Sequence, residues 1–391
     1  MASRETEILV VGAGLQGCAI ALFLARAGKQ VTIVEKNLAG RHASGVNAGG
    51  LRALMRDIRE YPLSLRAMEH WETLAALVGP AGAEAAEVRL GTSQIAVALD
   101  EAELAWTRER AADMRRQGIE TEELLTRDEV MALLPGLTSA ALGGLMSRRD
   151  GHANPANAAR AFHDAAVAAG AAVIERCPLQ TLSPQAGGRW LAETGAGTVA
   201  ARTVINCGGA WGAQVAALVG ETLPLRAAAL SMMVTERVAP FVTPVVLGID
   251  RPLSFKQSAA GSLVIGGGIL GKPCPEADTS FSIMDRMPRA AAATIEAFPA
   301  LAGVQALRTW TGLEGATPDG VPIIGPSARH ANLWHVFGFC GHGFQHSVAT
   351  GRHVAEWLLD GQSNLDLSPL GFARFAGRDT TVRGGLMSGV D

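Results

Sequence analysis

Residues 8–35 read ILVVGAGLQGCAIALFLARAGKQVTIVE, and this stretch decides the fold. The apolar run from Ile8 to Val11 is typical of a buried strand, and an almost wholly apolar helix is expected from Cys18 to Ala27. A second apolar run over 31–34 follows a glycine and is closed by Glu35. Strand, glycine-rich turn, helix, strand and acidic residue in this order predict a βαβ dinucleotide-binding unit.

The turn holds three glycines, Gly12, Gly14 and Gly17, in G-x-G-x-x-G spacing. In such a unit the first glycine makes the tight turn, the second lets the backbone approach a pyrophosphate, and the third lets helix and strand pack closely. The helix N-terminus near Leu15 offers free N–H groups and a positive dipole end to phosphates. Glu35 can accept hydrogen bonds from ribose hydroxyls. The motif alone fits both FAD and NAD.

Composition restricts the class of protein further. The chain has 391 residues and is 48% hydrophobic, enough for two domains with filled cores. A net charge of −3 and the lack of a basic run argue against nucleic acid as a partner. The short apolar helix lies inside the βαβ unit, so neither a signal peptide nor a membrane span is expected.

Cysteine and histidine usage predicts no metal site. The five cysteines are scattered without a CxxC pair, which favours reduced thiols and a cytoplasmic protein. His342 and His346 have i,i+4 spacing, but the sequence offers no evident third ligand or neighbouring carboxylate.

Hydrophobic periodicity and turn residues give a coarse map of the remaining chain. Helices are expected over 62–78, 101–117, 127–134, 156–169, 280–298 (bent or divided at Pro288) and 347–359. Strands are expected within 87–99 and over 143–146, 171–174, 203–206, 232–235, 245–248, 254–257, 263–268, 304–313, 321–324 and 333–336, with a hairpin excursion over 181–199. The polar, Gly-rich tail after Arg374 is expected to be loosely ordered.

Small residues and arginines follow the nucleotide unit. The stretch 43–50 is rich in small residues, which let a backbone lie close to a flat ring. Arg52 and Arg56 come next, four residues apart, so a helical turn would place both on one face. A solvated helix face would look similar, but the position after a nucleotide fold favours a site.

Two further glycine-rich segments lie at predicted strand ends. Residues 207–211 read CGGAW and could approach a cofactor or form a plain turn. The turn TPDG at 317–320 precedes the strands of the last third, and GFCGHGFQ at 338–345 opens the final helix. A glycine-rich loop at a helix N-terminus is suited to negative charge.

Together these motifs, in this order, resemble the D-amino acid oxidase-like FAD oxidoreductases, which include glycine and sarcosine oxidases and the β subunits of opine and hydroxyproline oxidases. The resemblance covers essentially residues 7–360 and implies FAD, an amine or amino-acid substrate, and an α/β Rossmann-like FAD-binding domain. It also implies an α+β substrate domain on a mainly antiparallel sheet. We expect the FAD-binding domain to be discontinuous, over 1–85, 145–218 and 320–391, with the substrate domain over 86–144 and 219–319.

The resemblance also assigns residues to parts of the cofactor. The pyrophosphate and ribose region would be held by Gly12, Ala13, Gly14, Leu15, Gln16, Gly17, Glu35, Lys36, Arg41 and His42. The isoalloxazine would lie beside Ser44, Asn47, Ala48, Gly49, Gly50 and Leu51. The adenine would meet the backbone near Leu179, and Cys207, Gly208, Trp211, Gly312 and Gly338 would lie against the cofactor. N–H groups of Gly341, His342, Gly343, Phe344 and Gln345 would face the pyrimidine edge of the flavin.

Departures from the family pattern bear on attachment and substrate. Sarcosine oxidases attach FAD through a cysteine just before the TPD turn, whereas 311–314 here reads TGLE, so noncovalent FAD is predicted. Glu314 stands where glycine oxidase-like members carry a carboxylate-binding arginine, and GLEG is closer to the opine and hydroxyproline oxidase β subunits. Gln345 replaces the lysine that follows HGF in sarcosine oxidases. The oxygen-activating lysine of sarcosine oxidases corresponds to a position near Val264 in this sequence.

The expected chemistry is oxidation of a C–N bond, with a hydride equivalent leaving the substrate α-carbon for flavin N5 and water hydrolysing the imine. A substrate carboxylate requires a cation, and Arg52, Arg56 and Lys256 are the candidates in that order. Glu314 could hold the substrate ammonium or accept its proton. His342 is expected to support the loop, which stabilises negative charge on the reduced ring.

Four functions remain open at the sequence level. The leading one is a flavin oxidase of a small anionic secondary amine, such as an N-substituted glycine or a cyclic imino acid, with O2 as acceptor. The second is a dehydrogenase subunit that acts beside an electron-transfer partner; a homo-oligomer is also compatible. The third is a 2-hydroxy-acid flavin dehydrogenase, and the fourth is a nonenzymatic flavoprotein or NAD-binding scaffold.

Overall fold

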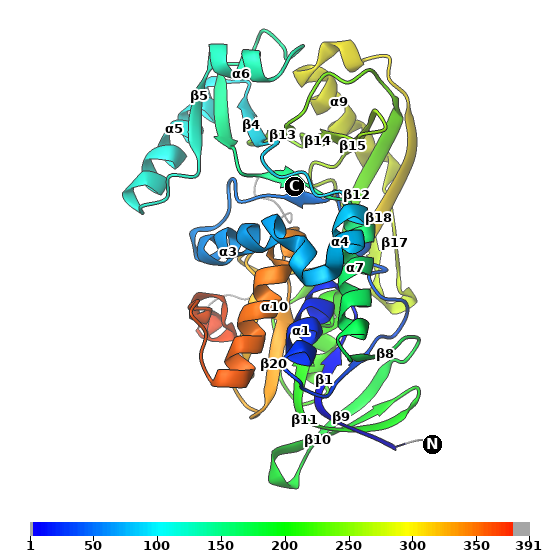
Figure 1. The fold of residues 1–391 in the computed structure, drawn as a ribbon. Helices are drawn as coiled ribbons and strands as arrows, with labels where there is room; N and C mark the ends of the chain where they lie inside the picture. Colours follow the sequence, from blue (N-terminus) through cyan, green and yellow to red (C-terminus); the bar gives the residue numbers. More distant parts are fainter. Residues whose placement is uncertain (1–2, 378–391) are drawn as a thin grey trace.

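The computed structural model describes residues 3–377, and these form two large β-sheets and two small strand pairs, with helices packed around them (Figure 1). The first sheet has the order β19-β20-β11-β1-β2-β8. Its members are β1 (Ser3–Val11), β2 (Val31–Val34), β8 (Ala172–Ile174), β11 (Gly197–Asn206), β19 (Ile323–Pro326) and β20 (Leu333–Phe337). Strands β20, β11, β1, β2 and β8 are parallel to their neighbours, whereas β19 is antiparallel to β20.

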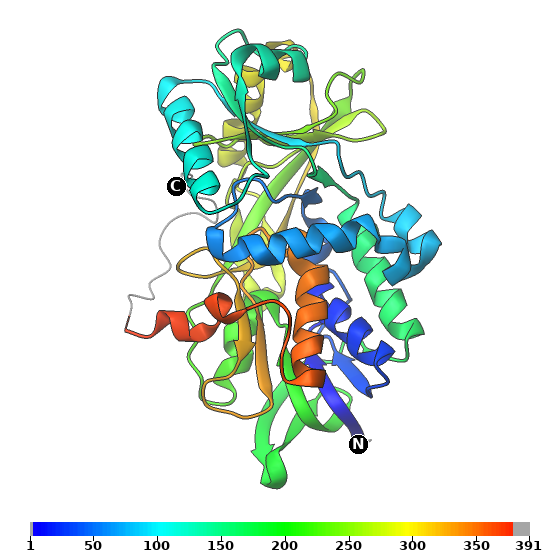
Figure 2. The same ribbon diagram turned by 60° about the vertical axis from the view of Figure 1, so that its left-hand side comes forward.

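Helices pack around this first sheet and against one another. They are α1 (Leu15–Arg26), α3 (Tyr61–Glu72), α4 (Leu74–Ala85), α7 (Pro155–Ala168), α8 (Gly212–Ala217) and α10 (Gly343–Asp360). Helix α1 packs between α7 and α10, and its close approach to α10 is made possible by Gly351, whose added Cβ would lie 2.7 Å from the Ala19 Cβ. Helices α3 and α4 run across the boundary between the two sheets (Figure 2).

The second sheet is mainly antiparallel, with the order β18-β12-β15-β14-β13-β4-β6-β5. Its strands are β4 (Gln94–Ala98), β5 (Glu123–Thr126), β6 (Gly143–Ser147), β12 (Arg226–Arg237), β13 (Val245–Gly248), β14 (Ser254–Gln257), β15 (Ser262–Ile265) and β18 (Ala306–Ala316). Helices α5 (Glu101–Arg116), α6 (Arg127–Leu133) and α9 (Met287–Ala297) accompany it. The expected boundary at 144/145 falls inside β6, which belongs to this sheet.

The remaining strands extend the first sheet or form small separate pairs. A hairpin of β9 (Leu179–Gln185) and β10 (Arg189–Thr194) extends β11, while β3 (Gly50–Leu51) pairs with β7 (Gly151–His152). The hairpin of β16 (Lys272–Cys274) and β17 (Thr279–Phe281) leaves the second sheet and contacts β18. The α/β class with a second, mainly antiparallel sheet is as the sequence predicts.

Several predicted elements differ from the observed ones. The helix expected over 62–78 is two helices that meet near Thr73, and the second is interrupted at Gly79, whose φ of +78° precedes Pro80. The helix expected from 280 begins only at Met287, because 279–281 forms β17, and Pro288 lies in its first turn where no N–H is needed.

Strand predictions also need correction. Of residues 87–99, only 94–98 form a named strand, and β11 is ten residues long because its first half pairs with β10. The last helix begins at Gly343, four residues earlier than expected, and ends at Gly361 in the left-handed conformation, a common helix end. The prediction of a loose tail after Arg374 concerns residues that lie largely outside the described range.

Candidate functional site

A long pocket lies between the two sheets, at the carboxyl ends of the parallel strands of the first sheet. It is lined by the β1–α1 turn, the end of β2, residues 40–56, the segment after β11, strands β12 and β18, and the loop before α10. Ligands of open parallel sheets bind at this edge, so topology and cavity indicate the same site.

The β1–α1 turn is built for a closely approaching phosphate. Gly12 has a φ of +106°, and a Cβ there would lie 2.5 Å from the Cys207 carbonyl oxygen. A Cβ on Gly17 would lie 2.1 Å from the Gly12 carbonyl oxygen, whereas Gly14 faces only the Ser44 hydroxyl, at 3.1 Å. The backbone N–H of Leu15 donates to Ser44 Oγ at 2.9 Å. The turn and the first residues of α1 also line the pocket, so the helix N-terminus lies at the cavity wall.

The end of β2 lines the part of the pocket where the ribose is expected. Glu35 accepts hydrogen bonds from the N–H groups of Ala13 and Asn37, at 2.8 and 2.9 Å, and burial raises its pKa. Lys36 lies over the Trp211 ring, 3.0 Å from its centroid, and pairs with Asp278 of the β16–β17 hairpin at 2.5 Å. The second sheet thus reaches the nucleotide end of the pocket through this hairpin.

Asp278 is the centre of this contact. Its carboxylate also accepts a hydrogen bond from Asn37 and pairs with Arg41 and His42. Burial opposes ionisation, but the hydrogen bonds from Lys36, Asn37 and His42 outweigh it and lower the pKa of Asp278 to about 2. The hairpin therefore carries a fixed negative charge against the cations that follow β2.

The short helix α2 (Ala43–Val46) and the turn after it run along the middle of the pocket. Asn47 donates to the carbonyls of Ala43 and Ser44, and its Oδ1 accepts from the Gly49 N–H at 2.7 Å. Strand β18 packs against this segment, and a Cβ on Gly312 would lie 2.1 Å from Val46 Cγ2. This contact requires glycine at 312.

The loop before α10 closes the far end. Gly338, Cys340 and Gly341 all have positive φ, at +76°, +52° and +87°. The Gly341 N–H donates to Glu314 Oε1 at 2.5 Å, so it points at this carboxylate rather than into the pocket. Burial raises the pKa of Glu314 to about 7. The first N–H groups of α10 remain as donors because a helix cannot pair them internally.

Arg52 and Arg56 both line the pocket, and both are buried, with 9% and 2% of their surface exposed. They do not lie on a helical turn as predicted, because Met55 has a φ of +57°; instead Arg56 Nε donates to the Arg52 carbonyl at 3.0 Å. Among the described residues neither forms a salt bridge, and Arg56 has a buried nitrogen, NH1, without a hydrogen-bond partner. Burial lowers the pKa of both, with mutual repulsion the second cause for Arg56, so a bound anion would be stabilised here.

Most residues expected at the cofactor lie on the pocket wall. They are Gly12, Gly14, Leu15, Gln16, Glu35, Lys36, Arg41, His42, Ser44, Asn47, Ala48, Gly50, Leu179, Cys207, Gly208, Trp211, Gly312, Gly338, Gly341, His342, Gly343 and Phe344. Glu314 also lies on this wall. Five expected residues do not line it: Ala13, Gly17, Gly49, Leu51 and Gln345.

Two expected catalytic side chains point elsewhere. Gln345 is fully buried, accepts from the Ser64 hydroxyl and donates to the Ser64 carbonyl, so its amide holds α10 to α3 and does not face a substrate. Lys256 is not on the pocket wall, and its Nζ donates to the Ala153 carbonyl at 2.9 Å. It is thus not placed to bind a carboxylate beside the arginines.

The second sheet contributes pocket residues that the sequence did not reveal. They are Leu230, Ser231, Met232, Leu247, Ser254 and Gly266, Gly267 and Gly268. The glycine run is followed by prolines rather than a helix, so no motif marked it as a site. Strands with alternating apolar residues are found in protein cores as often as on pocket walls. These residues reach the cavity only because the two sheets pack against each other.

Two absences are limited to the described residues. Residues 3–377 contain no group of three or more histidine, cysteine or acidic side chains placed to hold a metal ion. Within the same range, no helix is both long and apolar enough to cross a membrane.

A glycine-rich turn at a helix N-terminus, a carboxylate at the end of β2 and a second sheet over the pocket are typical of a dinucleotide-dependent protein. The family model described as FAD dependent oxidoreductase matches residues 7–357. The chain belongs to this family and is an FAD-dependent oxidoreductase. Its pocket fits FAD because the N-termini of two helices line the cavity wall, that of α1 through Gly14, Leu15 and Gln16 and that of α10 through Gly343 and Phe344.

Relatives of named function are similar over most of the chain. Glycine oxidase from Geobacillus kaustophilus is 28% identical over 383 residues, covering 96% of this chain and 99% of that protein. One opine oxidase subunit, from Rhizobium meliloti, is 28% identical, covering 95% of this chain and 98% of that protein. Human dimethylglycine dehydrogenase is 25% identical over 96% of this chain, which spans only 45% of that protein.

A solved structure agrees on the fold. The crystal structure of the Geobacillus glycine oxidase superposes with a TM-score of 0.84, at 24% identity, over 95% of this chain and 99% of that one. At this identity the superposition establishes the fold alone.

Proposed function

We propose that the protein oxidises the C–N bond of a small amino acid whose carboxylate is bound by Arg52 and Arg56. The observation that carries this proposal is the pair of buried guanidinium groups on the pocket wall without a salt-bridge partner among residues 3–377. A buried, unpaired charge costs free energy, and a bound carboxylate removes that cost through charge-assisted hydrogen bonds.

A secondary amine is the favoured substrate class. The curated relatives include dimethylglycine dehydrogenase and subunits of opine oxidase and sarcosine oxidase, all named for N-substituted amino acids. On the substrate side, Leu230, Met232 and Leu247 give the pocket an apolar wall. Such a wall accepts an alkyl group on the nitrogen or the ring of a cyclic imino acid.

The protein residues bind, orient and exclude water. Bound FAD supplies the acceptor for the electron pair and hydrogen that leave the substrate α-carbon. Arg52 and Arg56 fix one end of the substrate, so that its α-carbon has a defined place in the pocket. The unpaired N–H groups at the start of α10 stabilise negative charge at the adjacent edge of the cofactor. Water then hydrolyses the imine product, and O2 is reduced to H2O2.

The cofactor is proposed to be noncovalently bound. Cys207 and Cys340 line the pocket, but burial raises the pKa of both thiols, that of Cys340 to about 12, so neither is a ready nucleophile. Acid precipitation of the purified protein should release all of the yellow flavin into the supernatant. Flavin retained in the pellet would contradict this assignment.

A second candidate is a dehydrogenase subunit that passes electrons to a partner protein. It is favoured by relatives that are named as subunits, one of opine oxidase and one of sarcosine oxidase. The isolated chain would then be reduced by substrate but reoxidised slowly by O2.

One experiment separates the candidates. The purified flavoprotein is mixed anaerobically with a panel of secondary amino acids, imino acids, primary amino acids and 2-hydroxy acids, and flavin bleaching is followed. Fast bleaching by a secondary amino acid is expected, followed by H2O2 release on admitting air. Bleaching by 2-hydroxy acids alone would overturn the amine assignment.

A further inference from the structure

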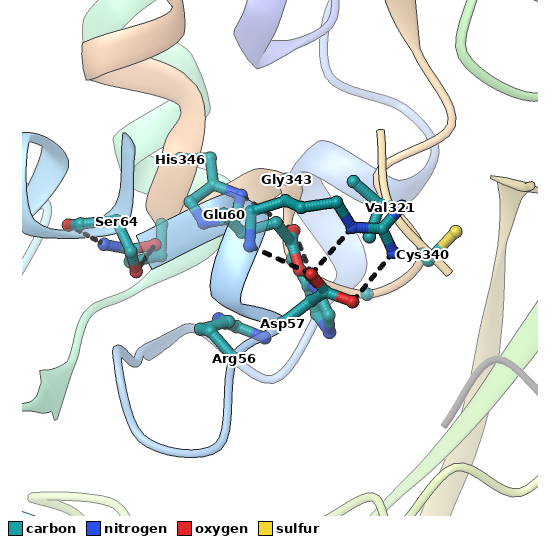
Figure 3. A network of polar contacts seen from close by, with 12 residues as sticks. Arg56, Asp57, Glu60, Ser64, Val321, Cys340, Gly343 and His346 are labelled. Carbon is teal, nitrogen blue, oxygen red and sulfur yellow. Dashed lines mark hydrogen bonds and ion pairs between the residues drawn. The ribbon is translucent and has the colours of Figure 1, made fainter. Parts of the chain in front are cut away.

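A buried carboxylate lies behind the pocket at the start of α10. Glu60 ends the 3-10 turn Ile58–Glu60 and is fully buried. Its Oε1 and Oε2 lie 3.0 and 3.1 Å from His342 Nδ1, and Oε1 lies 3.5 Å from His346 Nδ1 (Figure 3). His346 is itself fully buried, with neither ring nitrogen hydrogen-bonded. Of the two histidines, only His342 reaches the pocket.

The hydrogen bond to Glu60 defines the state of the His342 ring. Burial raises the pKa of Glu60, and the nearby Arg56 and Arg52 oppose that rise. The ionised carboxylate can only accept, so with Glu60 ionised Nδ1 carries the proton and Nε2 of the neutral ring carries a lone pair. The side chain is 15% exposed, and Nε2 is neither hydrogen-bonded within residues 3–377 nor among their buried orphan atoms. The accessible atom of His342 is therefore a proton acceptor at the pocket wall.

We infer that His342, positioned by Glu60, accepts the proton of the substrate ammonium group before oxidation. This inference rests on the proposed function and names the base of the same site. A zwitterionic amino acid arrives as an ammonium, whose nitrogen has no lone pair to form the C=N bond. Transfer of one proton from nitrogen to Nε2 gives the free amine and an imidazolium. The hydride then leaves the α-carbon for bound FAD, which takes up the electron pair, and the nitrogen lone pair forms the C=N bond of the iminium.

The surrounding charges couple this step to binding. Apart from Glu60, the charged or titratable groups near His342 are Arg52, Arg56, Asp57, Glu314, Cys340 and His346. Burial, and then Arg56 and Arg52, hold the pKa of His342 well below its usual value. A substrate carboxylate on the arginines offsets their charge and raises the proton affinity of the ring. Glu60 balances the imidazolium, as a buried carboxylate does beside a catalytic histidine.

Nitrogen NMR tests the ring state without requiring turnover. The holoenzyme is labelled with 15N at the histidine rings, and the two signals that disappear in His342→Asn are assigned to His342. In the wild-type protein these signals should show the Nδ1–H tautomer. Finding Nε2–H for that pair in the wild-type protein would overturn the inference. This readout is independent of whether any amine is a substrate.

The pH dependence of flavin reduction tests the role in proton transfer. The compound that bleaches the flavin fastest is used, and the second-order rate constant of anaerobic flavin reduction is measured against pH. This rate constant should reach its plateau at lower pH in the wild-type protein than in His342→Asn. In that variant the rate should fall tenfold per pH unit below the amine's own pKa, about 10 for an alkylammonium. Glu60→Gln should move the plateau in the same direction, because it removes the balancing charge.

A matched control uses the second histidine. His346→Asn alters a neighbour of the same carboxylate that does not reach the pocket, so the plateau should remain at the wild-type pH. An unchanged profile in His342→Asn would overturn the inference. If no compound of the panel reduces the flavin, the proposed function fails, whereas the NMR result still decides the tautomer.

Discussion

At the scale of single residues, we expect substrate recognition to depend on two buried cations, Arg52 and Arg56. Replacing Arg56 with Ala should weaken binding of the best substrate by about 2–4 kcal/mol, and Arg52→Ala should do the same, because each removes a desolvated partner of the carboxylate. Anaerobic flavin titration gives the Kd directly. Arg66→Ala is the matched control, since this arginine lies on the exposed face of α3 and, among residues 3–377, forms its salt bridge with Glu69. Unchanged Kd values in both variants would refute the clamp.

Glu314 gives a pH-dependent prediction of a different kind. Because the folded state raises the pKa of this carboxyl from 4.5 to about 7, it holds the proton more tightly than the unfolded chain. Ionisation therefore costs stability, beginning above pH 4.5 and reaching its full size above pH 7, at most about 3 kcal/mol. Glu314→Gln keeps an oxygen acceptor for the Gly341 N–H but removes this cost.

Thermal unfolding of the holoenzyme at pH 5 and pH 8 measures the effect. The Tm of Glu314→Gln minus the Tm of the wild type should be larger at pH 8 than at pH 5. Glu84→Gln, on an exposed surface of α4, should show no such difference. Equal pH dependence in the Glu314 variant and the wild type would argue that the carboxylate is compensated in the folded state.

At the scale of elements, the β1–α1 turn is sensitive to a single methyl group. Gly12→Ala places a Cβ 2.5 Å from a backbone oxygen at a φ of +106°, so the turn must move away from Cys207. The expected result is a purified protein with a strongly reduced flavin-to-protein ratio. Gly303→Ala, with open space around the added carbon, should retain its flavin. Full flavin content in Gly12→Ala would show that the turn does not hold the cofactor.

Local and non-local features differ in how far the sequence predicts them. The turn from Gly12 to Gly17 was predictable because its glycines, strand and helix are contiguous and each obeys a local steric rule. The His342–Glu60 contact joins residues 282 positions apart, and the pair of Lys36 with Asp278 also spans two sheets. The hydrophobic periodicity of a sequence predicts local elements and gives no information on contacts between residues so far apart in the chain.

Backbone detail was a second limit of prediction. The i,i+4 spacing of Arg52 and Arg56 suggested that both lie on one face of a helical turn. Met55 between them is in the left-handed conformation, so no helical turn forms, yet both arginines still line the pocket. Gln345 was expected at the flavin because it follows HGF, but the helix begins at Gly343, and its third residue is directed at α3. The position at which the helix starts therefore decides whether the Gln345 side chain faces the pocket or packs against α3.

At the scale of the whole molecule, the contact between the two sheets bears on the electron acceptor. Lys256 of β14 lies directly across from Val264 of β15, the position at which the family resemblance expects an oxygen-activating lysine. Its Nζ comes within 2.9 Å of where a Cβ on Gly49 would lie, next to the segment expected along the isoalloxazine. Burial lowers the pKa of Lys256 to about 8, so it remains largely protonated at neutral pH.

A cation at this place would stabilise negative charge developing on O2, so Lys256→Met should slow reoxidation of the reduced flavoprotein by air roughly 100-fold. Anaerobic reduction by substrate should change little, because Lys256 does not line the substrate pocket. Stopped-flow mixing of the reduced protein with O2 measures the first step, with Lys272→Met on the exposed β16 strand as control. If wild type and Lys256→Met reoxidise equally slowly, while a soluble dye accepts electrons rapidly from both, the chain is a dehydrogenase subunit, and the oxidase assignment fails.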